Sequence, residues 1–518
     1  MNQSSPEGGS AHGHASTKII RRLGYNESFQ LALHTLDQYR GTIVACRYSL
    51  PSGLASVASL GSIKSRVFDA IARVVLDHPH LQMGIIGENS KSPQFVRLDQ
   101  LDLHYHVDWR SCDDSVQLES QYLASIQCQL DARYSHISTR PGWRVVILYQ
   151  AAAKSMELLY VWNHVHHDGM SGKMFHQQLL RNLNKTIVQG DGLIHKTQQA
   201  EDSWKINLLD SSRIVPPPPE ILSSFSLTAP FLLKSLWKEL KPCSIFGISS
   251  THATWAPIQT SPFATRFHTF TVNNEIVAKV VSACHENRTT LTGLLHALVL
   301  LSLTSTLKDA KGFAGRTPYD MRHFLPSKTP EYPWLQPKES MCNYVSVLDH
   351  VFDADLVDMI RGKIQPTKEG LELSPDVADI VWSVSARIRR EIQTRLDSAV
   401  QNDLMALMKF VSDWRPQLHS EARKPRYLSW LISNVGILDG DIDKTPELEI
   451  EQEEVWSIRR GELVLSAEVA SAALSISVMT VRGEKMCVTC SWQDCAVDRD
   501  IGERLMDNLE SWLIEIGS

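Results

Sequence analysis

The length of the chain, 518 residues, is the sequence feature that most limits how it can fold. A single hydrophobic core rarely grows beyond about 250–300 residues, so we expect two domains. Four consecutive prolines at 216–219 favour an extended, stiff segment near the middle. We therefore predict one domain over residues 18–200, a crossover over 201–260 and a second domain over 261–518. Residues 1–17 lack a signal-peptide pattern and are expected to form a disordered tail.

Hydrophobic periodicity predicts both helices and strands in each half. An amphipathic helix over residues 63–75 is expected to end where His78 precedes a proline, because that position is pushed out of the helical region. Two apolar runs, Trp143–Tyr149 and Met156–Trp162, are joined by a short link that indicates an antiparallel hairpin. The last quarter predicts strands at 428–434, 455–466, 473–481 and 485–492. Without a strict strand–helix–strand rhythm, this mixture favours an α+β fold over a doubly wound sheet.

Charge and composition exclude several classes of protein. The net charge of −6 argues against a nucleic-acid-binding surface, which needs a clustered basic face. The longest apolar stretch, Leu291–Leu307, is interrupted by polar residues, so we expect a buried helix and no stable membrane insertion. A second apolar stripe over 501–516 is expected to pack on the core. Nine cysteines, an odd number, favour free thiols, and we expect a cytoplasmic monomer.

Common catalytic and metal-binding motifs are missing. The sequence has no G-x-x-x-x-G-K-[ST] phosphate loop, no G-x-G-x-x-G after a strand, no G-x-S-x-G nucleophile elbow and no H-E-x-x-H pattern. Cys487 and Cys490 have metal-ligand spacing, but strand alternation places their side chains on opposite faces. His12 and His14 could bind a metal, although a flexible tail is the simpler interpretation. We therefore expect neither a metal nor a resident cofactor.

The segment His164-Val-His-His-Asp168-Gly169 follows the second strand of the hairpin and is the strongest candidate for a catalytic site. Histidine has an unperturbed pKa of ~6.5, so its imidazole can take a proton from an alcohol and return it to a leaving group. Asp168 can hold the loop, and Gly169 can support its shape by relaxing the turn. Alternation from the strand places His164 and His166 on one face and His167 on the other, so His166 stays an alternative base. A metal site formed by His164, His166 and Asp168 is a further alternative.

This loop resembles the H-x-x-x-D-G motif of the CoA-dependent acyltransferase superfamily, which includes plant BAHD acyltransferases, carnitine acyltransferases and condensation domains. Other segments are similar, in the same order, to fungal alcohol O-acetyltransferases, and the resemblance spans residues 20–515. These segments are Arg22-Leu23-Gly24 with Glu27, His78-Pro79-x-Leu81, Pro141–Arg144, Thr317–Arg322, Asn343-Tyr344-Val345 and Ser433–Gly436. Two departures favour the fungal alcohol acetyltransferase branch of this superfamily. Asn163 stands where condensation domains have histidine, and the Asp-Phe-Gly-Trp-Gly motif of the plant members is absent.

The resemblance implies two similar mixed-sheet domains with a tunnel at their interface, entered by acyl-CoA from one side and by the acceptor from the other. It implies that His164 is the general base, and that Asp168 pairs with Arg322 and so holds the loop. It also implies that Ser433 and Asn434 face the tunnel and help to hold the oxyanion of the tetrahedral intermediate. An ordinary strand-to-turn cap is the alternative role for these two residues.

The implied reaction is the transfer of an acyl group, expected to be acetyl, from acyl-CoA to a hydroxyl of a small, largely apolar alcohol or specialised metabolite. In this interpretation acyl-CoA is a co-substrate. Two other functions stay open. The same fold could catalyse a CoA-independent cyclisation, elimination or rearrangement, or the chain could be a non-catalytic binding module.

Overall fold

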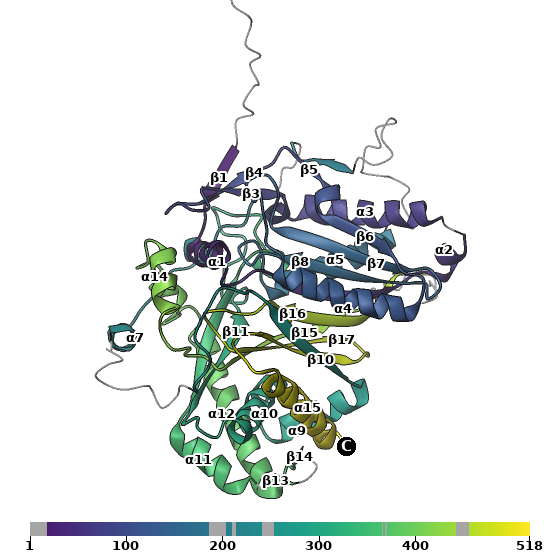
Figure 1. The fold of residues 1–518 in the computed structure, drawn as a ribbon. Helices are drawn as coiled ribbons and strands as arrows, with labels where there is room; N and C mark the ends of the chain where they lie inside the picture. The colour runs from purple at the N-terminus through teal and green to yellow at the C-terminus, as the bar shows by residue number, and fades with distance from the viewer. Residues whose placement is uncertain are drawn as a thin grey trace, which may run out of the picture.

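Two mixed β-sheets, each covered by helices, form the framework of the chain in its computed structural model (Figure 1). The structure describes residues 18–57, 59–185, 204–209, 214–240, 253–364, 366–367, 370–441 and 455–518. The predicted tail, with His12 and His14, lies outside the described residues, as does much of the predicted crossover. The α+β class with two mixed sheets is confirmed.

The first sheet has five strands in the order β16-β2-β8-β7-β6. Its bounds are β2 Thr42–Ser49, β6 Val107–Ser111, β7 Trp143–Gln150, β8 Ser155–Trp162 and β16 Ser457–Leu465. The predicted hairpin is confirmed, because β7 and β8 pair antiparallel with Trp143 opposite Trp162. Alternate residues of β2 face opposite sides: Val44 packs with α3 (Leu60–Asp77) and α5 (Gly169–Lys185), and Ile43 packs with α4 (Ser115–Asp131).

The second sheet has six strands in the order β10-β18-β17-β15-β11-β12. Its bounds are β10 Thr265–Val272, β11 Phe313–Asp320, β12 Val345–Phe352, β15 Trp430–Leu438, β17 Leu474–Val481 and β18 Met486–Gln493. It is covered by α9 Asn274–Glu286, α10 Leu291–Thr306, α11 Ala354–Lys363, α12 Pro375–Asp397 and α15 Arg499–Ile516. Every residue of α10 from Gly293 to Thr304 is buried, and α15 buries Leu509 and Trp512, so both predicted core helices are confirmed.

The strand β16 connects the two halves. It comes from the second half of the chain but pairs antiparallel with β2 over its length, from Ser457 opposite Ser49 to Leu465 opposite Thr42. The predicted boundary at residue 261 therefore does not separate the two sheets. The buried Glu462 of β16 also connects the two halves of the chain. Its carboxylate accepts hydrogen bonds from Tyr122 Oη of α4 (2.5 Å) and from Thr489 Oγ1 of β18 (3.0 Å).

The prolines of the predicted crossover are packed into the protein. Pro216–Pro219 are buried, and the carbonyl of Pro216 accepts a hydrogen bond from the Arg21 guanidinium (3.1 Å). The carbonyl of Pro217 accepts one from Tyr344 Oη (2.6 Å). The carbonyls of this segment therefore bind groups from both halves of the chain, Arg21 from the first and Tyr344 from the second.

Shorter elements complete the described fold. Residues 94–102 form two short strands with a bend at Asp99 between them. The remaining α-helices and strands of the described residues are β1 Lys18–Arg22, α1 Tyr25–Thr35, α2 Ser52–Val57, β3 Met83–Ile86, β4 Gln94–Arg97, β5 Gln100–Asp102, β9 Lys205–Asn207, α6 Pro219–Leu222, α7 Ala229–Leu240, β13 Pro366–Thr367, β14 Gly370–Leu371, α13 Met405–Met408 and α14 Trp414–Glu421.

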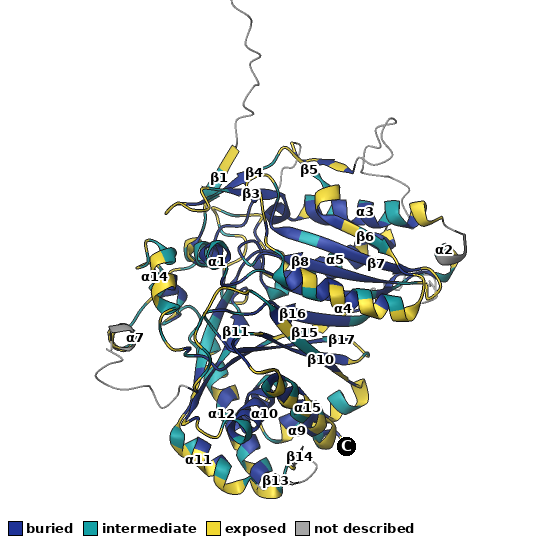
Figure 2. Cartoon of the chain, viewed as in Figure 1, coloured by how far each residue is buried: buried dark blue, intermediate teal, exposed yellow. Residues whose placement is uncertain are grey.

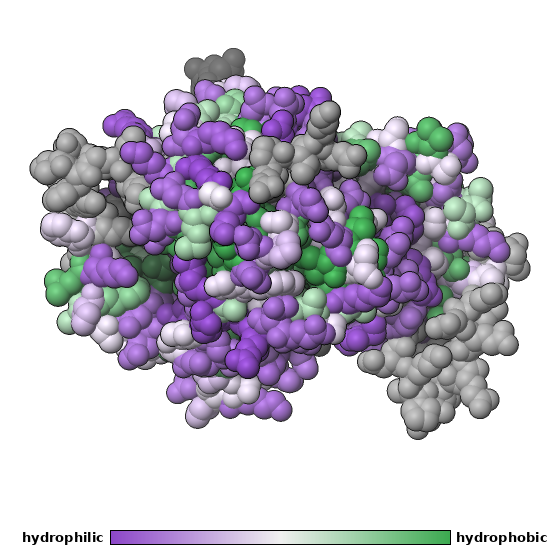
Figure 3. All heavy atoms as spheres, turned by 90° about the horizontal axis from the view of Figure 1, so that it is seen from below, coloured by the Kyte–Doolittle hydropathy of each residue, from purple (hydrophilic) through white to green (hydrophobic). Residues whose placement is uncertain are grey.

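The strands and the outer sides of the helices differ in how far they are buried. The strands are mostly buried while the outward sides of helices such as α4 and α11 are exposed (Figure 2). The lower face is mostly hydrophilic, with hydrophobic residues showing between polar ones (Figure 3).

The side chains of Cys487 and Cys490 lie on opposite faces of β18, as predicted. Cys490 packs in the core beside α15, whereas Cys487 lies near Glu462. Within the described ranges no single helix is long and apolar enough to span a membrane, and only α9 with α10, bent by 92°, passes that test as a pair.

Because β16 belongs to the first sheet by pairing and to the second by chain connection, we expect the whole chain to unfold in one cooperative transition. Differential scanning calorimetry should give a calorimetric enthalpy that equals the van't Hoff enthalpy. Two separate transitions, with the first sheet melting apart from the second, would contradict this view of the fold.

Candidate active site

The candidate loop forms a tight turn between the end of β8 at Trp162 and the start of α5 at Gly169. Within the turn, the Asn163 carbonyl accepts a hydrogen bond from the His166 amide (3.0 Å), and Asn163 Oδ1 accepts one from the Val165 amide (3.0 Å). The predicted strand alternation through this loop was therefore wrong. His164 is half-buried, whereas His166 is fully buried.

The alternative roles of His166 do not fit its surroundings. Its Nε2 lies 3.1 Å from the Met83 carbonyl, and burial lowers its pKa to about 4. Asp168 faces Arg322 instead, as described below. Because Arg322 binds both Asp168 oxygens, the geometry gives no support to a metal site formed by His164, His166 and Asp168. No group of His, Cys, Asp and Glu in the described part of the chain has the arrangement of a metal site.

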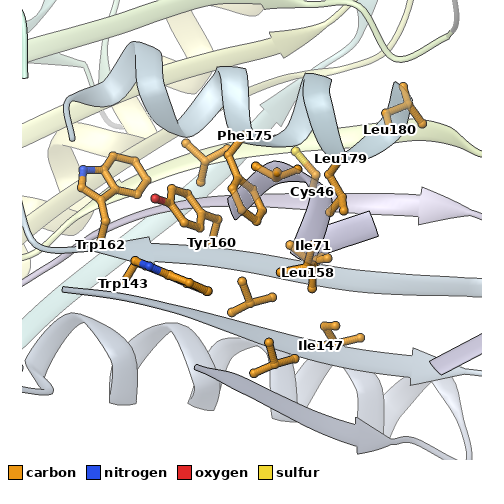
Figure 4. Close-up of a cluster of buried hydrophobic side chains, with 14 of the residues drawn as sticks. Cys46, Ile71, Trp143, Ile147, Leu158, Tyr160, Trp162, Phe175, Leu179 and Leu180 are labelled. Atoms are coloured by element: carbon orange, nitrogen blue, oxygen red, sulfur yellow. The ribbon is translucent and has the colours of Figure 1, made fainter. Parts of the chain in front are cut away.

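The aromatic side chains of Tyr160, Trp162 and Phe175 lie together between β8 and α5, at the two ends of the loop (Figure 4). Trp162 Nε1 donates a hydrogen bond to the His167 carbonyl (2.8 Å), and Tyr160 Oη lies 2.9 Å from Nδ1 of the same histidine. The Tyr160 ring stacks on Phe175 of α5 with centroids 3.9 Å apart. A Cβ at Gly172 would lie 2.4 Å from the Trp162 ring, so α5 can approach the end of β8 only with glycine there.

His164 presents one side of its ring to the protein and leaves the other free. Asn343 Nδ2 lies 2.6 Å from the His164 carbonyl oxygen and 3.4 Å from His164 Nδ1. The Tyr39 ring packs edge-on against the imidazole, with the two ring centroids 6.0 Å apart. Among the described residues Nε2 has no hydrogen-bond partner, and His164 as a whole is half-buried. Burial lowers the pKa of His164, and the charge of Asp168 offsets part of that effect.

Asp168 and Arg322 form a buried ion pair that joins the two halves. The guanidinium binds both carboxylate oxygens, with NH1 2.7 Å from Oδ2 and NH2 3.0 Å from Oδ1, and each residue is 2% exposed. Asp168 also accepts hydrogen bonds from the amides of Ser171 (2.9 Å) and Tyr344 (2.9 Å). Burial alone would raise the pKa of Asp168, but the Arg322 charge and these bonds lower it. The predicted pairing is present, and the carboxylate has no oxygen left for a substrate.

Sequence reasoning missed the backbone groups that complete this arrangement. Arg322 donates to the carbonyls of Ser340 (3.2 Å) and Cys342 (3.0 Å), and Ser171 Oγ accepts a hydrogen bond from the Cys342 amide (3.0 Å). Carbonyl and amide groups leave no signature in residue identity. The only available signal was Ser171 three residues after Asp168, a spacing typical of a helix N-cap, and Asp168 does cap α5.

Gly169 and the Ser433–Gly436 segment lie against each other. A Cβ at Gly169 would be 3.1 Å from Val435 Cγ1, and its backbone φ is not positive, so the glycine provides space and does not relax a turn as predicted. Asn434 is exposed, donates to Thr292 Oγ1 (3.2 Å) and accepts from the Gly436 amide (2.9 Å). Ser433 is half-buried on the same strand. Both residues lie within β15, whose pairing is irregular after Asn434 and then resumes, so they are not at the strand-to-turn boundary that the capping alternative assumed. The oxyanion role stays a prediction, as does the tunnel.

Comparisons with known proteins agree with this geometry. Residues 113–333, which contain both His164 and Arg322, match a family model described as alcohol acetyltransferase. A probable alcohol acetyltransferase, FCK4 of Fusarium pseudograminearum, is 28% identical over 98% of this chain and 97% of its own length. Another, crmB of Aspergillus fumigatus, is 23% identical over 92% and 95%. The structure of the trichothecene 15-O-acetyltransferase TRI3 from Fusarium sporotrichioides shares the fold, with a TM-score of 0.70 and 13% identity over 98% and 97% of the two chains. The predicted resemblance is confirmed, and the chain is an acyltransferase.

We expect Asp168→Asn to lower the free energy of unfolding by about 3–5 kcal/mol at neutral pH, because it leaves the Arg322 charge buried without a partner. The folded-state pKa of Asp168 is depressed, so the contribution is complete above its ordinary pKa of about 3.9 and is lost as pH falls through the lower folded value. Urea unfolding at several pH values should show this difference shrinking in acid.

Asp108→Asn is the matched control, because Asp108 forms an exposed ion pair with Arg110 (2.6 Å). It should change stability far less. An equal loss in both variants would contradict a special role for the buried pair.

Proposed function

We propose that this chain, a relative of the fungal alcohol acetyltransferases, transfers an acetyl group from acetyl-CoA to the hydroxyl of a small, largely apolar alcohol, with His164 as the general base. One observation carries the proposal. Of the three histidines in the loop, only His164 is not fully buried, and its ring is close enough to the buried Asp168–Arg322 pair for the charge of Asp168 to act on it. That combination suits a base that must meet two substrates between two domains.

In the proposed mechanism the neutral imidazole of His164 takes the proton from the acceptor hydroxyl at Nε2. The alkoxide oxygen attacks the thioester carbonyl of acetyl-CoA, and the tetrahedral intermediate collapses to the ester and the thiolate. The imidazolium then returns its proton to the thiolate, so protons balance and no covalent enzyme intermediate is needed. The lowered pKa of His164 supports this role, because it keeps the ring neutral at physiological pH.

The choice of donor and acceptor rests on the relatives. The matching family model and the two fungal relatives carry the name alcohol acetyltransferase, and the structural neighbour TRI3 acetylates an oxygen of a trichothecene. These names support an acetyl donor and a hydroxyl of a specialised metabolite as the acceptor. Acetyl-CoA as the donor, a cytoplasmic location and a monomeric state stay predictions.

We expect His164→Ala to lose about 10²–10⁴-fold in turnover, because the general base is removed. Its binding of CoA, followed by a thermal-shift titration, should persist because no other contact changes. His285→Ala, at an exposed histidine at the end of α9, should keep full activity. Full transfer by the His164→Ala variant to any accepted alcohol would contradict the assignment.

The same assay separates acyl transfer from the CoA-independent alternative. The enzyme is incubated with an alcohol panel, with and without acetyl-CoA, and product masses are measured. We expect a gain of one acetyl group only when acetyl-CoA is present. An isomerised or dehydrated product formed without it would favour cyclisation, elimination or rearrangement.

The pH profile gives an independent prediction. Only neutral His164 acts as a base, so kcat/KM should fall as pH drops through its pKa, with a midpoint below the ordinary value of ~6.5. Removing the Asp168 charge lowers this pKa further, so the residual activity of Asp168→Asn should fall at still lower pH. A midpoint that moves upward in this variant would rule out the stated electrostatic relation.

A further inference from the structure

A pair of buried asparagines continues from the candidate base into the first half of the chain. Asn343 lies on the segment that leads into β12, and Asn26 lies in the first turn of α1; the two residues are 2% and 6% exposed. Asn26 Nδ2 donates a hydrogen bond to Asn343 Oδ1 (2.9 Å), and it also approaches the Val345 carbonyl (3.4 Å). Asn343 Nδ2 then donates to the His164 carbonyl (2.6 Å).

The partners of Asn343 determine which way its amide faces. Its oxygen accepts from Asn26, whose own Nδ2 can only donate, so the Asn343 nitrogen must face His164. The same Nδ2 also lies 3.4 Å from His164 Nδ1, so one amide group contacts both the backbone and the ring of this histidine. The Nε2 atom lies on the opposite edge of the ring from Nδ1.

The buried ion pair also orients Asn343. The neighbouring Cys342 carbonyl binds Arg322 (3.0 Å), and the Tyr344 amide binds Asp168 (2.9 Å). The backbone groups of residues on either side of Asn343 are thus held by the ion pair, while the Asn343 side chain reaches the turn that carries His164.

We propose that Asn343 is a positioning residue: by holding the His164 carbonyl it fixes the position and orientation of the imidazole, so that Nε2 meets the acceptor hydroxyl. This inference rests on the proposed function of His164. The role requires no contact of Asn343 with substrate. Among the described residues, Asp168 is the charged group that acts on the His164 ring, and the uncharged Tyr39 ring packs against it edge-on.

Two substitutions of Asn343 separate positioning from general stability. Asn343→Ala removes the donor and should lower kcat by about 10²-fold, the cost of misplacing a catalytic group, with little change in KM for acetyl-CoA. Asn343→Asp keeps the shape but places a carboxylate beside Nδ1. A nearby opposite charge favours the imidazolium, so the acid limb of kcat/KM should move to higher pH by about one pH unit or more.

A second readout does not depend on turnover. Diethyl pyrocarbonate modifies neutral, accessible imidazole, so its rate at His164, located by mass spectrometry, follows the protonation of that ring with pH. We expect the midpoint of this rate to rise in Asn343→Asp as well. Asn26→Ala, which leaves Asn343 in place but frees its amide to turn over, should lower kcat in the same direction and by less than Asn343→Ala.

Asn184→Ala is the matched control for the loss of a buried asparagine. Its Nδ2 donates to the Trp456 carbonyl (3.0 Å), away from the loop, and it is 8% exposed. It should lower thermal stability without changing kcat or the pH profile. If the Asn343 variants behave like this control, with unchanged pH midpoints in both readouts, the inference is overturned. If His164→Ala keeps full turnover, the proposed function itself fails, so the two failures are distinguishable.

Discussion

The buried ion pair between Asp168 and Arg322 is the interaction on which the site depends. Two charges removed from water are tolerable only when each is satisfied, and here the carboxylate and the guanidinium meet through two hydrogen bonds and further backbone groups. Because Asp168 begins α5 in the first half and Arg322 follows β11 in the second, the pair can form only when the halves are assembled. The site is therefore complete only when the two halves of the chain are packed together.

The three histidines of the loop differ in burial and in the roles that their surroundings allow. His166 and His167 are fully buried and bind the Met83 carbonyl and the Tyr160 hydroxyl, so they hold the turn. His164 stays half-buried, with a free Nε2 at the end of β8. The strand β16 adds a second connection between the halves, so the loop sits in a framework that resists relative movement of the sheets. Rigid support of this kind suits a base that must meet a hydroxyl and a thioester together.

Much of this could be predicted from the sequence where residue identity carries the signal. The hairpin of β7 and β8, the buried helix α10 and the pairing of Asp168 with Arg322 follow from apolar patterning and from motifs. Long-range strand exchange could not be predicted, since nothing in the residues of β16 specifies β2 as its neighbour. The predicted strand alternation through the loop was wrong because a turn follows Trp162. The tight space at Gly169 could not be predicted, because the side chain that limits it, Val435, lies far along the chain. The amide contacts of Asn26 and Asn343 depend on the same long-range packing.

The central claim is that Asp168 and Arg322 act as one unit in holding His164, and a double-mutant cycle on kcat/KM tests it most directly. The proteins are the wild type, Asp168→Asn, Arg322→Gln and the double variant, each corrected for its folded fraction. Residues that act as a unit are strongly non-additive, so the double variant should lose no more activity than the worse single variant. Losses that simply multiply would show that the two residues act independently and would contradict the account.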